Sequence, residues 1–230
     1  MKTIGLLGGM SWESTVTYYQ LLNRMTRDRL GGLHSAKCLL WSFDFADVAK
    51  AQSDGDWARA TRLMIDAAQN LERGGAECLV ICTNTMHKMA GEVQNAVDIP
   101  LIHIADATAP AIKSAGSTAP LLLATAYTME QDFYKGHLRD QHGIEVRIPK
   151  ADDRAEVHRI IYEELCQGDV LERSKARYLD VVDRAVAAGA DGVIFGCTEI
   201  GLLVSEADFS VPAFNTTALH AEAAVSFALG

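Results

Sequence analysis

Two stretches of the chain repeat each other, Gly75-Ala76-Glu77-Cys78-Leu79-Val80-Ile81-Cys82-Thr83-Asn84-Thr85 and Gly189-Ala190-Asp191-Gly192-Val193-Ile194-Phe195-Gly196-Cys197-Thr198-Glu199. They align without a gap at a separation of 114 residues. Each follows a segment with the apolar spacing of an amphipathic helix, Trp57–Leu71 and Ser174–Ala188. Each is a short apolar run that ends in polar residues, which is typical of a buried strand in a parallel sheet. The repeat therefore predicts two similar α/β units.

Two further pairs of segments support a duplication. Thr3–Ser14 aligns with Pro120–Gln131 at a separation of 117, which matches Ser11 to Thr128. Asp98-Ile99-Pro100 aligns with Ser210-Val211-Pro212 at a separation of 112. Because the three matches occur in the same order with similar separations, we interpret them as one duplicated unit with small insertions.

The duplication predicts an α/β fold of two pseudo-symmetric lobes with largely parallel sheets. We expect one lobe to comprise residues 1–100 plus 211–230 and the other to comprise residues 101–210, with the ligand in the cleft between them. The expected strands are Thr3–Leu7, Cys38–Ser42, Cys78–Cys82, Leu101–Ile104, Leu121–Ala124, Val193–Phe195 and Pro212–Phe214. Val157–Leu165 predicts a helix that Gly168 ends.

Composition excludes several classes of protein. The 230 residues are 49% apolar, so a globular core is expected, and the net charge of −9 includes no basic run that would bind nucleic acid. No apolar run approaches the ~20 residues that span a bilayer, and the N-terminal apolar stretch lacks the features of a secretory signal. Five cysteines without disulfide-framework spacing predict reduced thiols in the cytoplasm.

The polar ends of the repeated strands are the expected site. Ligands of open α/β sheets bind beyond the carboxyl ends of the strands. If the lobes are related by a pseudo-twofold axis, Thr83 and Cys197 lie on opposite faces of a bound ligand. A planar carbanion at a substrate Cα would fit between them, with its carboxylate received by Thr85, Thr198 and backbone N–H groups of the helix starts.

At these residues the sequence resembles the aspartate/glutamate racemase family. The resemblance is carried by the opening Ile4–Thr15, by Asn84-Thr85-Met86-His87 and by Phe195–Ile200, in the family's order. It implies an amino-acid racemase that works without pyridoxal phosphate or another cofactor. No metal site is expected, because the spacing of Cys78, Cys82 and His87 fits no common zinc pattern. The resemblance also implies a homodimer, a small amino-acid substrate and one catalytic cysteine from each lobe.

The chain departs from the family at the first catalytic position. Where the family has Cys-Asn-Thr, this sequence has Thr83-Asn84-Thr85, and Cys82 lies one residue too early. A displacement of one residue on a strand turns a side chain to the opposite face. We therefore expect Cys197 as the base and Thr83, a far weaker acid and poor base, on the opposite side. One enantiomer should react faster than its mirror image.

Weaker patterns suggest further substrate contacts. The resemblance places Met10 in the pocket, and Gly5, Gly8 and Gly9 would let Met10 and Ser11 approach the ligand through their backbone. Asn84 and Thr128, which follow expected strands, are further candidates for substrate contacts. Thr128 to Gln131 also fits a capping box, which would give Thr128 a structural role. Gln52 and Glu164 are candidates for recognising the substrate side chain. The acids Glu163 and Glu164 disfavour a dicarboxylate unless they point away from the site, so an uncharged polar amino acid is an open alternative to an acidic one.

Other functions fit the same pattern. Relatives of this architecture resemble hydantoin racemases, decarboxylases of malonates and maleate isomerases, and a single thiol on one face suits asymmetric decarboxylation. A non-catalytic amino-acid-binding protein that has lost one acid/base group is a further alternative. A Cys–His hydrolase is disfavoured because no motif places a histidine beside Cys197.

Overall fold

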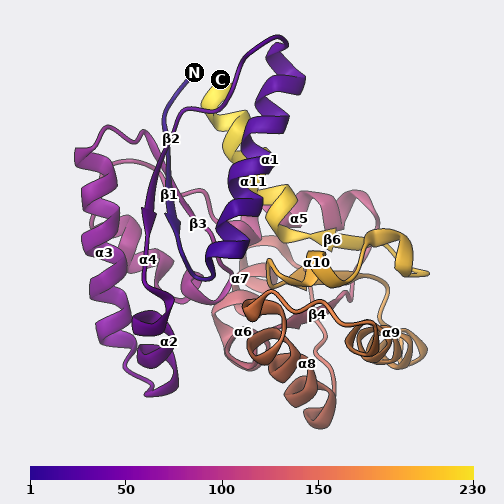
Figure 1. Ribbon diagram of the computed structural model, residues 1–230. Coiled ribbons are helices and arrows are strands. Elements are labelled where there is room, and N and C mark those ends of the chain that lie inside the picture. The colour runs from indigo at the N-terminus through magenta and orange to yellow at the C-terminus, as the bar shows by residue number, and fades with distance from the viewer. The chain divides into compact units, whose positions relative to one another are not determined.

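A computed structural model describes residues 1–230 and divides the chain into two compact units. The first unit is Met1–His103 together with His220–Gly230, and the second is Ile104–Leu219. Each contains a three-stranded parallel sheet flanked by helices (Figure 1). The prediction of an α/β fold built from two similar parts with parallel sheets is confirmed.

The first unit has the strand order β2-β1-β3, so that β1 (Ile4–Gly8) is central. Its other elements are β2 (Cys38–Ser42), β3 (Cys78–Ile81), α1 (Trp12–Leu30), α2 (Phe45–Ser53), α3 (Trp57–Arg73), the 3-10 helix η1 (Thr85–Met89), α4 (Ala90–Asn95) and the C-terminal part of α11 (Thr216–Leu229). Alternate residues of the sheet face opposite layers. Leu7, Leu79 and Ile81 pack with α2, α3 and α4, and the other face packs with α1 and α11.

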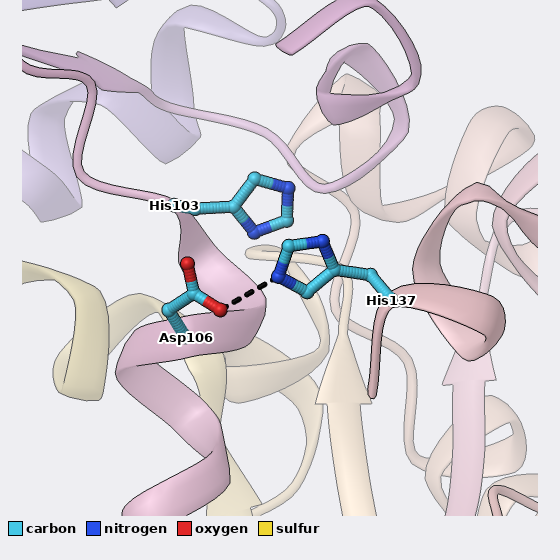
Figure 2. A group of neighbouring side chains, drawn as sticks. All are labelled: His103, Asp106 and His137. Carbon is cyan, nitrogen blue, oxygen red and sulfur yellow. Dashed lines mark hydrogen bonds and ion pairs between the residues drawn. The ribbon is translucent and has the colours of Figure 1, made fainter. Parts of the chain in front are cut away.

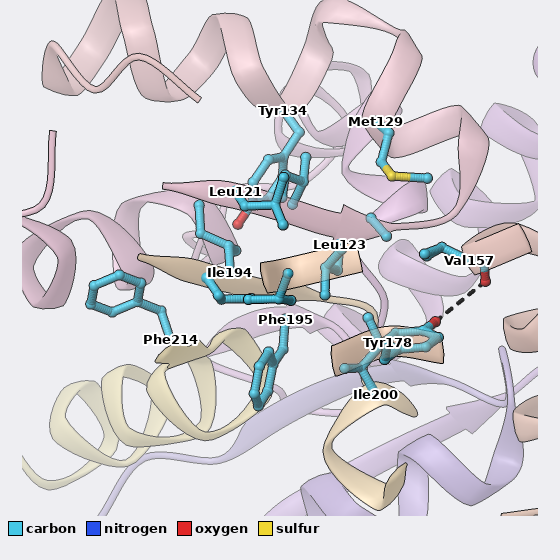
Figure 3. Packing of buried hydrophobic residues seen from close by; sticks show 14 of the residues in the cluster. Leu121, Leu123, Met129, Tyr134, Val157, Tyr178, Ile194, Phe195, Ile200 and Phe214 are labelled. Atoms are coloured by element: carbon cyan, nitrogen blue, oxygen red, sulfur yellow. Dashed lines mark hydrogen bonds between the residues drawn. The ribbon is translucent and has the colours of Figure 1, made fainter. Parts of the chain in front are cut away.

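The second unit has the strand order β4-β5-β6, with β5 (Val193–Gly196) central. Its other elements are β4 (Leu121–Ala124), β6 (Ala213–Asn215), α5 (Ile104–Ser114), α6 (Ala126–Glu130), α7 (Asp132–His142), α8 (Ala151–Glu163), η2 (Leu165–Gln167), α9 (Glu172–Ala187), α10 (Ile200–Leu203) and η3 (Glu206–Asp208). Figure 3 shows the core around these strands, where the Tyr178 hydroxyl donates to the Val157 carbonyl at 3.3 Å. No helix of either unit is long and apolar enough to cross a membrane.

The strand registers repeat between the units and correct one of the three alignments. Leu79 pairs with Leu101 in the first unit, and Val193 pairs with Ala213 in the second, as separations of 114 and 112 require. Leu79 also pairs with Gly5, whereas Val193 pairs with Leu121. These pairs give a separation of 116 for the first strand rather than 117. Ser11 and Thr128 are therefore not equivalent by strand register.

Three expected boundaries also differ. The expected strand Leu101–Ile104 is reduced to one bridge at Leu101, because α5 already begins at Ile104. Residues 211–219 belong with the second unit, since β6 pairs with β5. The helix expected over Val157–Leu165 ends at Glu163, and a 3-10 turn leads to Gly168, which adopts a left-handed conformation.

Candidate active site

Cys197 directly follows the central strand of the second unit. Its carbonyl accepts a hydrogen bond from the Ile200 N–H at 3.2 Å, which begins the short helix α10. The preceding residue must be small, because a Cβ on Gly196 would lie 2.5 Å from a methyl carbon of Leu122. The close packing of β5 against β4 therefore fixes the strand end from which Cys197 projects.

Glu199 is the principal polar partner of Cys197. The Cys197 thiol donates to Glu199 Oε2 at 2.9 Å, and the Thr198 hydroxyl donates to the same oxygen at 2.7 Å. The Cys166 thiol approaches the other oxygen, Oε1, at 3.7 Å. Glu199 itself is buried. The sequence prediction did not assign a role to Glu199, although its place two residues after Cys197 in the repeated stretch was a usable signal.

The surroundings of Cys197 disfavour its thiolate form. Burial raises the pKa of this thiol well above its ordinary value, and the negative charge of Glu199 and the neighbouring Cys166 raise it further. A helix start can lower the pKa of a thiol, but its effect on Cys197 is small. α10 is only four residues long and offers little dipole, whereas the acid is in direct contact. The resting thiol is protonated, with a carboxylate positioned to accept its proton.

Two tyrosines from neighbouring helices belong to the same environment. Burial raises the pKa of Tyr162 on α8 and of Tyr178 on α9, and the negative charge of Glu199 raises both further. Both phenols therefore remain protonated over the physiological pH range. The electrostatic environment of the thiol therefore contains two neutral phenols and one buried carboxylate.

Thr83 occupies the corresponding strand end in the first unit. Its carbonyl accepts a hydrogen bond from His87 Nδ1 at 2.8 Å, which holds the turn into η1. Asn84 and Thr85 are buried, whereas Thr83 is partly exposed. Thr83 is thus the most accessible of these three polar residues.

Cys82 does not share this exposure. It is fully buried in the core between the first sheet and the helices α1 and α11, together with Cys78. Burial raises the pKa of the Cys82 thiol far above its ordinary value. Cys78 and Cys82 both pack in the core, and Cys82 has the environment of a structural cysteine.

Met10, Ser11 and Gln52 are all buried within the first unit. The Ser11 hydroxyl caps α1 by accepting from the Ser14 N–H at 3.3 Å. The Gln52 amide nitrogen lies 3.2 Å from the sulfur of Met86, at the start of the strand-end turn. These contacts give Ser11 a structural task and link Gln52 to the segment that carries Thr83.

Gly8 and Gly9, at the end of β1, are glycines because a larger side chain would not fit against neighbouring segments of the chain. Gly9 has a φ of +82°, and a Cβ there would lie 2.5 Å from the backbone nitrogen and oxygen of Phe43. A Cβ on Gly8 would lie 2.6 Å from Thr15. These residues are required by packing of the chain against itself.

Thr128 and Glu164 are engaged inside the second unit. The fully buried Thr128 hydroxyl lies 3.3 Å from that of Thr125, which precedes α6, so the predicted capping box from Thr128 to Gln131 is wrong. Glu164 accepts from Arg159 at 3.0 Å and, through its other oxygen, from the hydroxyl of Ser174. One carboxylate oxygen thereby bonds a residue of α8 and the other joins Glu164 to α9, which gives Glu164 a structural task.

Known proteins resemble this chain along its whole length. The family model described as Asp/Glu/Hydantoin racemase matches residues 7–224. The chain is 25% identical to the broad specificity amino-acid racemase RacX of Bacillus subtilis (strain 168), over 97% of this chain and 96% of that protein. A candidate Asp/Glu racemase from Yersinia pestis is 53% identical with a TM-score of 0.92, and an aspartate racemase homologue from Pyrococcus horikoshii OT3 is 33% identical with a TM-score of 0.86. Each of these two matches covers 100% of this chain and 100% of the chain in the solved structure.

Proposed function

The chain belongs to the Asp/Glu/hydantoin racemase family, and we propose that it interconverts L- and D-amino acids by removing and returning the Cα proton without a cofactor. The contact between the Cys197 thiol and Glu199 at 2.9 Å is the observation that carries this proposal. A buried carboxylate beside a thiol can accept the thiol proton when the site needs a thiolate.

The proposed reaction begins with transfer of the Cys197 thiol proton to Glu199. The thiolate then takes the Cα proton, which leaves a planar carbanion stabilised by the substrate carboxylate. On the Thr83 side, the hydroxyl donates a proton to the opposite face, directly or through a water, and is itself reprotonated by water at once. Loss of the proton on Glu199 to solvent restores the starting state of the enzyme.

The two directions of this reaction are not equivalent. A threonine hydroxyl is a far weaker acid than a thiol and holds no useful population of alkoxide, so Thr83 serves as a donor and not as an efficient base. We expect Cα deuterium exchange in D2O to start faster from the enantiomer whose Cα proton faces Cys197. Equal initial rates from both enantiomers would contradict this bias. Thr83→Cys should raise the rate from the slow enantiomer, while Cys82→Ala, in the core, should leave the ratio unchanged.

For the substrate side chain, we propose an uncharged polar group. Gln52 offers an amide, and the cation nearest to it in sequence, Lys50, pairs with Asp54 at 2.8 Å on the surface. An amide can hydrogen-bond a neutral polar side chain but cannot neutralise a second carboxylate. Gln52→Leu should therefore raise KM for asparagine or glutamine more than for alanine.

The decisive experiment is a screen of L- and D-amino acids for Cα deuterium incorporation, with wild type beside Cys197→Ser. Cys38→Ser is the matched control, because Cys38 lies on β2 of the other unit. All five cysteines are free thiols, which fits the cytoplasmic location that we propose, and the assay therefore contains a reductant. Activity that survives Cys197→Ser would overturn the mechanism. Binding without exchange would indicate an amino-acid-binding protein, and CO2 release from malonates would indicate a decarboxylase.

We further propose that the active form is a homodimer. Trp12, Val16 and Tyr19 form one exposed apolar stripe on α1, with exposed fractions of 64%, 44% and 56%. Leu33, in the loop after α1, is fully exposed at 102%. Aromatic side chains gathered on a helix face are typical of the central part of protein interfaces. A second copy of the chain is the occupant we propose.

A further inference from the structure

Two histidines of α7 converge on one carboxylate of α5 within the second unit. Asp106 lies in the first turn of α5, and its Oδ1 is 2.6 Å from Nε2 of His137 and 2.7 Å from Nε2 of His142. The hydrogen bond from His137 is drawn in Figure 2, which also shows His103, the residue that precedes α5 in the chain. The three side chains of Asp106, His137 and His142 are called the α5–α7 triad below.

The α5–α7 triad is accessible to an ion from solution. The exposed fractions of the side chains are 51% for Asp106, 25% for His137 and 21% for His142. The triad shares no residue with the strand-end turns that carry Thr83 and Cys197. The proposed racemisation therefore does not account for the placement of these three side chains.

We propose that the α5–α7 triad binds a divalent transition-metal ion. Two imidazole nitrogens and one carboxylate oxygen are the donors that Zn²⁺, Co²⁺ and Ni²⁺ prefer, and three protein ligands leave positions for water. Because both imidazoles now donate to the same oxygen of Asp106, metal–ligand bonds of about 2.0–2.2 Å require these partly exposed side chains to rotate around the ion. Each imidazole that now donates through Nε2–H moves this proton to Nδ1 or to solvent, because a metal ligand needs the free lone pair.

Such an ion would replace the two hydrogen bonds that now join α7 to Asp106 of α5 by metal–ligand bonds. His142 is the last residue of α7 and is followed by Gly143, which adopts a left-handed conformation at φ +69°. His137 lies five residues earlier, about 7.5 Å along the helix axis. A metal bound to both histidines and to Asp106 would fix the end of α7 to the beginning of α5. Metal binding should thus raise the unfolding temperature of the protein.

The test uses the full chain without an affinity tag, freed of metal by a chelator and titrated with ZnCl2 or CoCl2. We expect one equivalent of Co²⁺ to give visible d–d absorption without the intense ultraviolet charge-transfer band of a cobalt–thiolate bond. This spectrum separates the triad from binding by any of the five free thiols. The same titration followed by calorimetry should give a dissociation constant below about 100 µM.

Variants of the triad supply the controls. His137→Gln, His142→Gln and Asp106→Asn should each weaken Zn²⁺ binding at least tenfold and remove the rise in unfolding temperature. His34→Gln, which alters an exposed histidine of the first unit, should bind like wild type. Absence of stoichiometric binding to wild type would overturn the proposal, whatever the folding of the variants. So would binding that persists unchanged in both His137→Gln and His142→Gln.

Discussion

Glu199 holds one carboxylate oxygen within hydrogen-bonding distance of the two side chains that precede it, Cys197 and Thr198. Its charge acts on Cys197 in two opposite ways. It raises the pKa of the thiol and so lowers the resting population of thiolate. In the proposed reaction it also takes the thiol proton, so that the thiolate forms where the substrate is bound.

Glu199→Gln separates these two effects. The neutral amide removes the negative charge that raises the pKa of Cys197, so alkylation of this thiol by iodoacetamide at pH 8 should become faster. The amide cannot accept the thiol proton, so kcat/KM for Cα exchange should fall by about 10²–10³. Peptide mapping of alkylated Cys197 and D2O exchange measure the two quantities. Glu145→Gln, at an exposed site of the same unit, is the control. A variant that changes both rates in the same direction would contradict this role.

At the scale of single elements, the turn after β1 depends on a glycine. Gly9 has a φ of +82°, and a Cβ there would overlap the backbone of Phe43. Gly9→Ala should lower the free energy of unfolding by about 3 kcal/mol, from backbone strain and overpacking together. Gly91→Ala is the matched control, because Gly91 lies on the exposed side of α4 with open space around it. This control should be neutral or stabilising by up to about 1 kcal/mol, and urea denaturation compares the two variants.

A buried histidine ties α11 to α1 within the first unit. His220 accepts from the Tyr18 hydroxyl at 2.8 Å and donates to the Ile102 carbonyl at 2.7 Å, which requires a neutral ring. Burial lowers the pKa of His220 to about 4. The unfolded chain, with a histidine pKa of about 6.5, binds the extra proton first as the pH falls. Stability from this group is complete above pH 6.5 and is lost progressively down to about pH 4, by up to about 3 kcal/mol.

His220→Gln tests this pH dependence. The variant should be less stable than wild type at pH 8, because the hydrogen bonds and packing of the ring are lost. The difference should shrink as the pH falls from 6.5 to 4, since only wild type carries the titrating group. Chemical denaturation at several pH values measures both curves. Parallel curves for wild type and His220→Gln would show that His220 does not titrate as described.

The sequence predicted most of the helices and strands but not the contacts between them. The apolar spacing of α3 predicted one buried face, and Ala60, Met64, Ala67, Ala68 and Leu71 are all buried. The carboxylate–thiol contact of Glu199 depends on a turn conformation that periodicity does not encode. The α5–α7 triad arises only when two helices pack, and no local spacing joins Asp106 to His137. The alignment of β1 with β4 was displaced by one residue because similarity alone could not place a single-residue gap.

For the whole molecule, the exposed apolar stripe on α1 predicts that the chain forms a dimer through this face. Replacing both Val16 and Tyr19 by lysine places charges on the surface that we propose a second copy covers. Sedimentation velocity should show a dimer for wild type and a monomer for the double variant, with unchanged helical circular dichroism. Val170→Lys, at a surface valine of the second unit that is 51% exposed, should remain dimeric. A monomeric wild type, or a double variant that stays dimeric, would contradict the assignment of this face.

The discontinuity of the first unit has a consequence for the chain during its synthesis. Ala221, Ala224 and Val225 of α11 pack with Tyr18 on the sheet face that contains Leu6, yet the ribosome adds them after the entire second unit. Residues 104–219 can therefore acquire their fold while one face of the first sheet is still bare. Nascent chains that carry an added C-terminal linker, are stalled about 30 residues beyond Leu219 and are treated briefly with protease should show this order. The first unit would thus finish folding last although most of it is synthesised first. Its uncovered sheet face would be the place where a chaperone is needed.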